Sequence, residues 1–190
     1  MRDLEKRGRT TSGEGERRAM RGFMPQYDFA ARLIYDALIA GKLQWVGLTD
    51  RAAGSFDDIV LGLQDRVVGY QVKSSRDPES FRCRDLLLGA RNLLARFVET
   101  STALRIAFPD KTVQVGFVTD DYPSTRDNLA RGLSPVSSAA FLRLFAARGN
   151  QWTASQWRSS EVGDFFDELQ RASGLSEDEF SSFWKGVFFK

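Results

Sequence analysis

Two neighbouring stretches of the sequence carry side chains that could hydrolyse a phosphodiester bond. Asp57 and Asp58 stand at the start of an apolar run, and Gln71 and Lys73 lie in the next one. A carboxylate and an amide oxygen suit a hard cation such as Mg²⁺ or Mn²⁺, which lowers the pKa of bound water. A lysine beside the cation and the phosphate can orient or deprotonate the attacking water, or stabilise the transition state. The residues therefore favour metal-dependent hydrolysis.

The composition excludes several other kinds of catalyst. The 190 residues contain no histidine, so there is no Ser-His-Asp triad, histidine base or histidine-bound zinc. Cys83 is the single cysteine and can form no disulfide within the chain, which favours the reducing cytoplasm as the location. A reactive Cys83 thiol is the less favoured interpretation. The net charge of +2 does not by itself indicate a nucleic-acid partner.

The expected pairing of the two apolar runs selects one of the two aspartates. Residues 56–63 and 67–74 are predicted as strands joined by a tight turn at Gln64-Asp65. A two-residue turn places Asp58 opposite Gln71, with Lys73 diagonal to it on the same face. Asp57 then points to the other face. A turn of three or five residues would select Asp57 instead.

The remaining elements must hold this hairpin in place. Apolar periodicity and turn signals predict a helix, three strands, a helix, a strand and further helices. This order favours an α/β fold with a mixed β-sheet flanked by helices and a helical C-terminal part. The predicted elements are a helix over residues 26–40, strands at 45–48, 56–63, 67–74 and 113–119, a long helix from 84 to beyond 97, helices near 137–148 and 160–173, and a last helix that begins at a capping box at Ser176.

The chain is expected to form one domain behind a basic leader. Residues 1–21 are polar and charged and are predicted to be flexible, and residues 22–190 form the domain, with a core at 22–120 and a helical extension at 121–190. The many aromatic residues of the last third are expected to pack rather than stack on bases. The apolar strand expected near the end suggests the N-terminal part of a longer protein, or an edge that pairs with another chain. No segment is apolar over the roughly 20 residues that a membrane span requires.

The hairpin residues resemble the PD-(D/E)XK nuclease superfamily in its QxK variant, as in Mrr-like restriction endonucleases. Gly22-Phe-Met-Pro-Gln26 is similar to the opening of the double-stranded-DNA endonuclease domains of bacterial antiviral effectors, found in CBASS systems and in STAND-type Avs proteins. Phe117-Val-Thr-Asp120 is also similar. The resemblance covers about residues 22–120 and implies a restriction-endonuclease-like fold.

This resemblance also implies an activity and roles for particular residues. It implies a Mg²⁺-dependent endonuclease that cuts double-stranded DNA in antiphage defence and that oligomerises or is fused to sensor or ATPase domains. Asp58 and Gln71 are implied as metal ligands, Lys73 as the catalytic lysine and Gln26 as an active-site residue of the first helix. Many relatives carry a glutamate on that helix, whereas residues 26–40 contain none.

Four arginines follow the second strand and could contact DNA phosphates. Arg84 and Arg91 share one face of the expected long helix, and an ordinary solvated surface is an equally favoured interpretation. A catalytically silent module that binds nucleic acid or a protein partner is the main alternative function, and an RNA-directed nuclease is a third. The predicted DNA-binding residues are Arg76, Arg82, Arg84 and Arg91.

Overall fold

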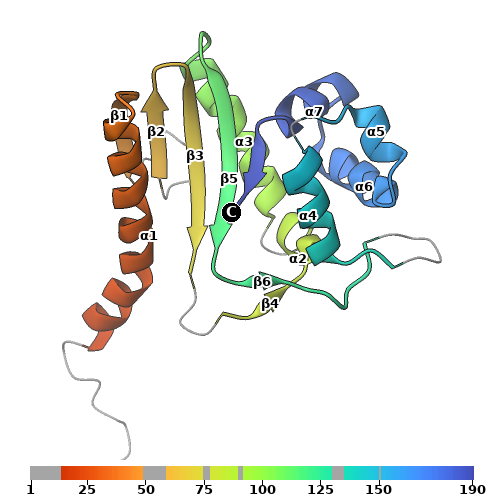
Figure 1. Ribbon diagram of the computed structural model, residues 1–190, viewed down its shortest axis with the longest axis horizontal. Coiled ribbons are helices and arrows are strands. Elements are labelled where there is room, and N and C mark those ends of the chain that lie inside the picture. Colours follow the sequence, from red (N-terminus) through yellow and green to blue (C-terminus); the bar gives the residue numbers. More distant parts are fainter. Residues whose placement is uncertain (1–13, 49–58, 75–77, 90–91, 130–134, 150) are drawn as a thin grey trace, which may run out of the picture.

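The protein is a mixed α/β structure built around a five-stranded sheet with the order β1-β2-β3-β5-β7 (Figure 1). The computed structural model describes residues 14–48, 59–74, 78–89, 92–129, 135–149 and 151–190, with side chains from residue 24 onward. The predicted fold class is confirmed. The strands of the sheet are β1 (Leu43–Leu48), β2 (Ile59–Leu63), β3 (Arg66–Lys73), β5 (Thr112–Thr119) and β7 (Val187–Phe189).

Helices cover both faces of this sheet. Helix α1 packs on one face, and α3 packs on the other face with the C-terminal helices beyond it (Figure 1). The short strands β4 (Ser80–Phe81) and β6 (Tyr122–Pro123) form a separate parallel pair. The helices are α1 (Glu14–Ile39), α2 (Cys83–Leu87), α3 (Leu93–Ala107), α4 (Ser138–Arg148), α5 (Ala154–Arg158), α6 (Gly163–Ser173) and α7 (Glu177–Trp184).

The β2–β3 hairpin has the register predicted from the sequence. Ile59 pairs with Tyr70 and Gly62 pairs with Val67, which leaves Gln64 and Asp65 as the turn. Tyr70 belongs to the core under α1, so the alternation of the strand turns Gln71 and Lys73 to the opposite face. Asp57 and Asp58 lie outside the described residues.

A crossover through α3 places β5 beside β3 in parallel. Gln71 pairs with Phe117 and Lys73 pairs with Thr119. Parallel neighbours require such a long connection, and their carboxyl ends emerge at the same edge of the sheet. Residues that follow β3 and β5 therefore meet, although they are distant in the sequence.

The first helix is longer than predicted. It begins at Glu14 and continues through Pro25, so part of the expected flexible leader is helical, while residues 1–13 lie outside the described part. Proline favours the first turn of a helix, so Pro25 makes the sequence predict a helix that starts at Gln26. Within a helix, proline removes one backbone hydrogen bond and costs about 3 kcal/mol, but it does not always end the helix.

The predicted long helix from residue 84 is wrong, because the chain forms two helices there. α2 ends at Leu87, and α3 begins at Leu93 after Asn92, whose φ of 43° is left-handed. Buried leucines of both helices face one core at spacings that suit a single helix, so the periodicity concealed the break. Asparagine adopts the left-handed region more easily than most residues.

The C-terminal aromatic residues pack as predicted. Most of them fill one core with β5 and α3, where Trp157, Phe165 and Phe166 are 0–1% exposed, whereas Phe188 packs against Tyr70 in the core under α1. Ser176 and Glu179 form the predicted capping box, whereas the short α5, capped by Thr153, was not predicted. β7 pairs in parallel with β5.

Among the described residues, no helix is both long and apolar enough to cross a bilayer.

Candidate functional site

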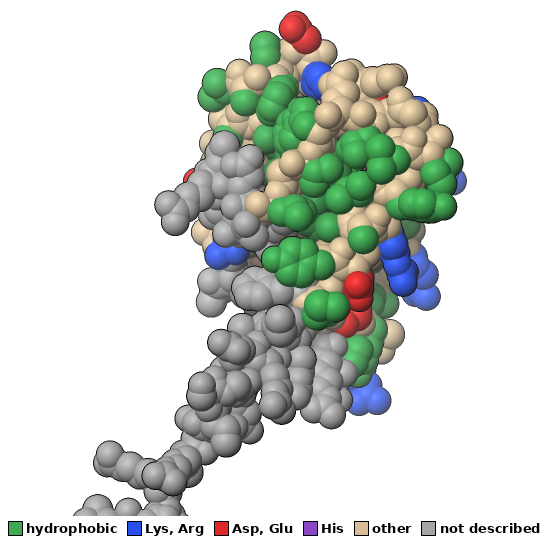
Figure 2. All heavy atoms as spheres, turned by 90° about the vertical axis from the view of Figure 1, so that its left-hand side faces the viewer, with side chains coloured by type: hydrophobic (Ala, Val, Ile, Leu, Met, Phe, Trp, Pro, Cys, Tyr) green, Lys and Arg blue, Asp and Glu red, His purple; other side chains and the backbone are tan. Residues whose placement is uncertain are grey.

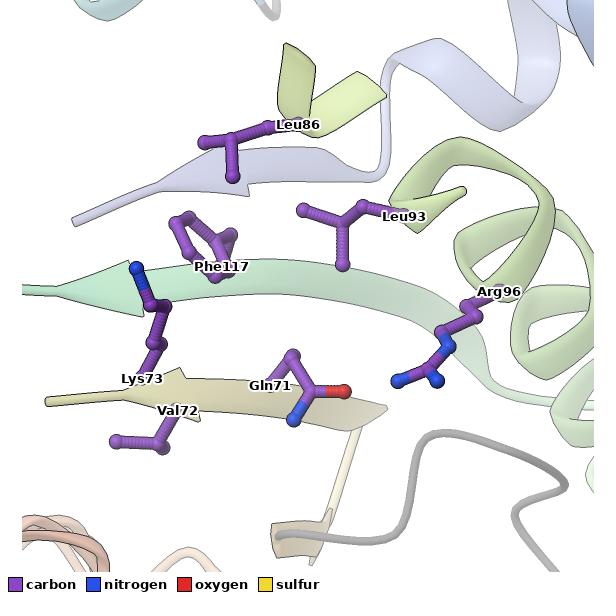
Figure 3. Close-up of a pocket in the computed structure, with 7 residues that line it drawn as sticks. All are labelled: Gln71, Val72, Lys73, Leu86, Leu93, Arg96 and Phe117. Atoms are coloured by element: carbon purple, nitrogen blue, oxygen red, sulfur yellow. The ribbon is translucent and has the colours of Figure 1, made fainter. Parts of the chain in front are cut away.

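A pocket of about 290 Å³ lies beside β3, on the face of the sheet that α3 covers (Figure 3). One part of its wall is polar and comes from β3 and α3, and the rest is apolar. This combination suits a ligand that has a charged group and an uncharged body. The lining residues are Gln71, Val72, Lys73, Leu86, Leu93, Arg96 and Phe117.

Gln71 and Lys73 both line this pocket, as their spacing on the strand predicted. Both side chains are partly buried, but their polar ends point to opposite sides of the pocket (Figure 3). The amide of Gln71 is directed toward the guanidinium of Arg96, and the ammonium group of Lys73 extends past Phe117. The pocket therefore has a cation at each end and an amide between them.

The ammonium group of Lys73 is held by a buried carboxylate that the sequence did not reveal. Lys73 Nζ lies 2.5 Å from Oδ2 of Asp121, whose side chain is 5% exposed. Asp121 Oδ1 accepts a hydrogen bond from the Glu79 backbone N–H at 3.0 Å, and the Asp121 backbone N–H donates to Thr119 Oγ1 at 3.0 Å. This network fixes the carboxylate at the shared edge of β3 and β5. The sequence signal that could have indicated Asp121 is the acidic pair Asp120-Asp121 directly after the apolar run of β5.

Arg96 was also missed by the sequence analysis. It lies on the first turns of α3, is exposed, and projects into the pocket (Figure 3). The predicted DNA contacts are arginines that closely follow β3 in the chain, and Arg96 lies further along it. Only the packing of α3 against the sheet brings it to the pocket.

Gln26 contacts β3 but does not line the pocket. It lies on α1, and its Nε2 donates to the backbone oxygen of Val72 at 3.5 Å. Because α1 covers the opposite face of the sheet, Gln26 supports the β3 backbone between Gln71 and Lys73. The structure therefore places Gln26 behind β3 and outside the pocket.

The predicted arginines have different surroundings. Arg82 is exposed and lies 3.9 Å from Asp85. Arg84 binds Glu168 at 2.9 Å and stacks over Phe165, with its guanidinium carbon 5.7 Å from the ring centre, so it joins α2 to α6.

Two of the predicted arginines, Arg76 and Arg91, lie outside the described residues. The expected common helix face of Arg84 and Arg91 is wrong, because α2 ends at Leu87. Of the two predicted arginines that the structure describes, Arg82 and Arg84, the side chain of Arg82 is the more exposed.

The described side chains alone supply few ligands for a hard cation. They contain no cluster of three or more acidic or cysteine residues that could enclose a metal. Gln71 contributes an amide oxygen to the pocket, and the Asp121 carboxylate is already bonded to Lys73. The predicted carboxylate ligand, Asp58, lies outside the described residues. Such a donor set would rely on water and substrate phosphate to complete the coordination of Mg²⁺, which commonly retains waters.

Cys83 is a core residue and takes no part in the pocket. It is 1% exposed, and its backbone N–H donates to Ser138 Oγ at 2.7 Å. Burial raises the pKa of the thiol to about 12; a side-chain hydrogen bond with Ser138 acts against this shift, and the charge of Asp127 adds to it. The structure thus favours the unreactive interpretation of this cysteine.

We expect the Cys83 thiol to stay unmodified by a thiol-specific disulfide reagent at pH 8 until the protein unfolds.

The buried Cys83 thiol should also make the stability of the fold depend on pH at high pH. The thiol stays protonated in the folded chain up to about pH 12 but ionises from its ordinary pKa of 9.0 once unfolded, so its contribution to stability is lost as pH rises from 9 to 12. Cys83→Ala should therefore lose less stability over this range than the wild type in urea titrations. Rapid labelling of Cys83 in the folded protein would contradict the prediction that its thiol is buried and unreactive.

Asp121→Asn should remove the charged partner of Lys73 while keeping an acceptor for the Glu79 N–H. We expect a loss of about 1–3 kcal/mol in the free energy of unfolding, because the site is buried and a charge-assisted bond is lost. Urea unfolding measures it. The matched control is Asp120→Asn, since Asp120 is exposed and bonds Ser74 Oγ at 2.6 Å, and exposed pairs contribute little. Equal losses in both variants would refute the special role of Asp121.

Comparisons with protein-family models, with curated proteins and with solved structures gave no match to this chain. Its fold and pocket define a class in physical terms: a mixed α/β protein with a pocket that carries two cations and an amide beside its central hairpin. Any more specific function is a matter of inference from these groups.

Proposed function

We propose that this chain is a metal-dependent endonuclease that hydrolyses phosphodiester bonds in double-stranded DNA, as an effector in antiphage defence. The observation that supports the chemistry is the pocket in which Gln71 and Lys73 of β3 lie with Arg96 of α3. The choice of duplex DNA and the defence setting rest on the resemblance of residues 22–26 and of the hairpin to antiviral endonuclease domains.

The two cations of the pocket suit a bound phosphodiester. Arg96 presents a guanidinium that can bond two phosphate oxygens, and Lys73 offers a compact positive charge at the other end. Between them, Gln71 would orient a phosphate oxygen or hold the cation with Asp58. A bound Mg²⁺ would supply Lewis acidity and a water of lowered pKa.

Asp121 and Gln26 would prepare Lys73 for this role. Asp121 is fixed by Glu79 and keeps the ammonium group at the edge of β3 and β5. Gln26 bonds the backbone one residue before Lys73. A lysine held in this way orients the attacking water or stabilises charge on the phosphate with little reorganisation during the reaction.

The direct test is cleavage of supercoiled plasmid DNA. We expect nicked and then linear products with Mg²⁺ or Mn²⁺, and no products with EDTA. Parallel reactions on linear duplex, single-stranded DNA and RNA of the same sequence identify the preferred substrate. Preference for RNA would replace the duplex-DNA assignment, and absence of cleavage with either metal over a range of protein concentrations would contradict the nuclease proposal.

One observation favours a second candidate, a catalytically silent nucleic-acid-binding module. In the described residues, the one buried carboxylate beside Lys73 is bonded to it rather than directed at a cation. Arg96 and Lys73 could then retain phosphate binding without hydrolysis. Retarded migration of duplex DNA, with an affinity that falls steeply with salt and no cleavage, would identify this function.

A further inference from the structure

Helix α1 has an apolar face directed away from the sheet. Met24, Tyr27, Tyr35 and Leu38 are 53–64% exposed, and Ala31 between them is also exposed. Figure 2 shows hydrophobic side chains gathered on this side of the molecule. We call these five residues the outer stripe.

Another face of the same helix is already used by the core. Ala30, Leu33 and Ala37 pack against the sheet together with residues of β2 and β3. A helix at the surface of a globular protein normally has one apolar face and one polar face. A second apolar face, exposed beside the one in the core, therefore indicates that α1 packs on a further surface, because exposed apolar patches commonly mark interaction sites.

We propose that the outer stripe binds the outer stripe of a second copy of this chain, in antiparallel orientation. The stripe residues follow at steps of three and four, as in helices that pack along their length. Their order is symmetric about Ala31, so an antiparallel two-fold axis there places Met24 on the partner's Leu38 and Tyr27 on the partner's Tyr35. The small side chain stands where the helices cross.

The charges beside the stripe support the same pairing. Asp28 and Arg32 are exposed on one flank of the stripe, and neither forms an ion pair within the described part of its own chain. The antiparallel axis through Ala31 brings this flank against its own copy, so Asp28 lies near the partner's Arg32 and Arg32 near the partner's Asp28. A parallel pairing would put the two flanks on opposite sides.

The size of the stripe predicts a modest affinity. Its large side chains, each about half exposed, offer roughly 100 Å² apiece, or roughly 400 Å² per copy, against about 800 Å² per partner in a standard interface. We therefore expect an equilibrium between monomer and dimer that depends on concentration. The pocket lies on the other face of the sheet and stays open, and the dimer does not depend on the proposed nuclease activity.

Disulfide trapping tests the pairing, because Cys83 is buried and an introduced cysteine is the reactive one. Ala31→Cys should give a disulfide-linked dimer under mild oxidation. Met24→Cys and Leu38→Cys chains should cross-link to each other when mixed, and much less when each is alone. Asp36→Cys, on the same helix and exposed but outside the stripe, is the control. Cross-linking of Met24→Cys alone would contradict the antiparallel order.

Sedimentation velocity over a range of concentrations tests the dimer itself. We expect a wild-type sedimentation coefficient that rises with concentration, and monomer throughout for Leu38→Asp. The control is Ile106→Asp, an equal change at an apolar residue of α3 that is 78% exposed, which should leave the dimer intact. A wild-type monomer at all concentrations, with Ala31→Cys no more cross-linked than Asp36→Cys, would overturn the proposal and leave the stripe for a different partner.

Discussion

Lys73→Ala should lower the rate of Mg²⁺-dependent plasmid cleavage by about 10²–10³-fold, which is the usual cost of removing a group that stabilises transition-state charge. Lys73 lines the pocket and is the last residue of β3. The substitution also leaves Asp121 buried without its charged partner. We therefore expect a loss of about 1–3 kcal/mol in stability, and rates should be compared at a temperature where both proteins are folded.

Two further variants separate charge from position. Lys42→Ala removes the same charge at the turn before β1, at the opposite end of the sheet, and should leave the rate unchanged. Lys73→Arg keeps a positive charge and a donor for Asp121, but arginine cannot be deprotonated, so a large loss of rate would indicate proton transfer by Lys73. Wild-type rates in Lys73→Ala would remove Lys73 from the mechanism. A parallel Asp58→Ala variant tests the predicted metal ligand, which lies outside the described residues.

Trp157→Ala should destabilise the fold by about 3–5 kcal/mol, the range for replacing a large buried aromatic residue. Trp157 is 0% exposed and stacks on Phe166 at 5.7 Å, with Trp152 at 5.1 Å edge to face. Its removal would leave a cavity at the centre of the aromatic core that joins α4, α5 and α6. Urea unfolding followed by circular dichroism measures the change.

Trp157→Phe is the matched control for this cavity. The indole Nε1 of Trp157 is buried and has no hydrogen-bond partner among the described residues. Phenylalanine removes that polar group and keeps most of the ring, so we expect a cost of about 1 kcal/mol, since burying an unsatisfied N–H is itself unfavourable. A loss as large as that of the alanine variant would show that the indole N–H has a partner and that the cavity is not the main cost.

The sequence by itself determined the elements whose signals are local. The two-residue turn at Gln64-Asp65 sets the register of β2 and β3, because the length of a hairpin turn determines which residues pair. Side chains then alternate strictly along each strand. That register places Gln71 and Lys73 on one face. The capping box at Ser176 is equally local, since the side chains of an N-cap and of N3 bond each other's backbone groups.

Periodicity was a poorer guide where one pattern suits two structures. The leucines of α2 and α3 face one core at spacings that a single helix would also give. The sequence therefore predicts one long helix, whereas the helix breaks before Asn92, which has a left-handed backbone. Pro25 had the opposite effect, because its preference for a first turn concealed a helix that continues through it.

Only the tertiary structure decided which charged groups surround Lys73 and which surface of α1 remains exposed. Asp121 reaches Lys73 because the α3 crossover sets β5 in parallel beside β3, and Arg96 reaches the pocket because α3 packs on that sheet face. These contacts join residues far apart in the chain, and such pairings depend on how elements pack rather than on any local preference. The spacing of residues along the chain thus determined the hairpin and the direction of its side chains, and packing determined their partners.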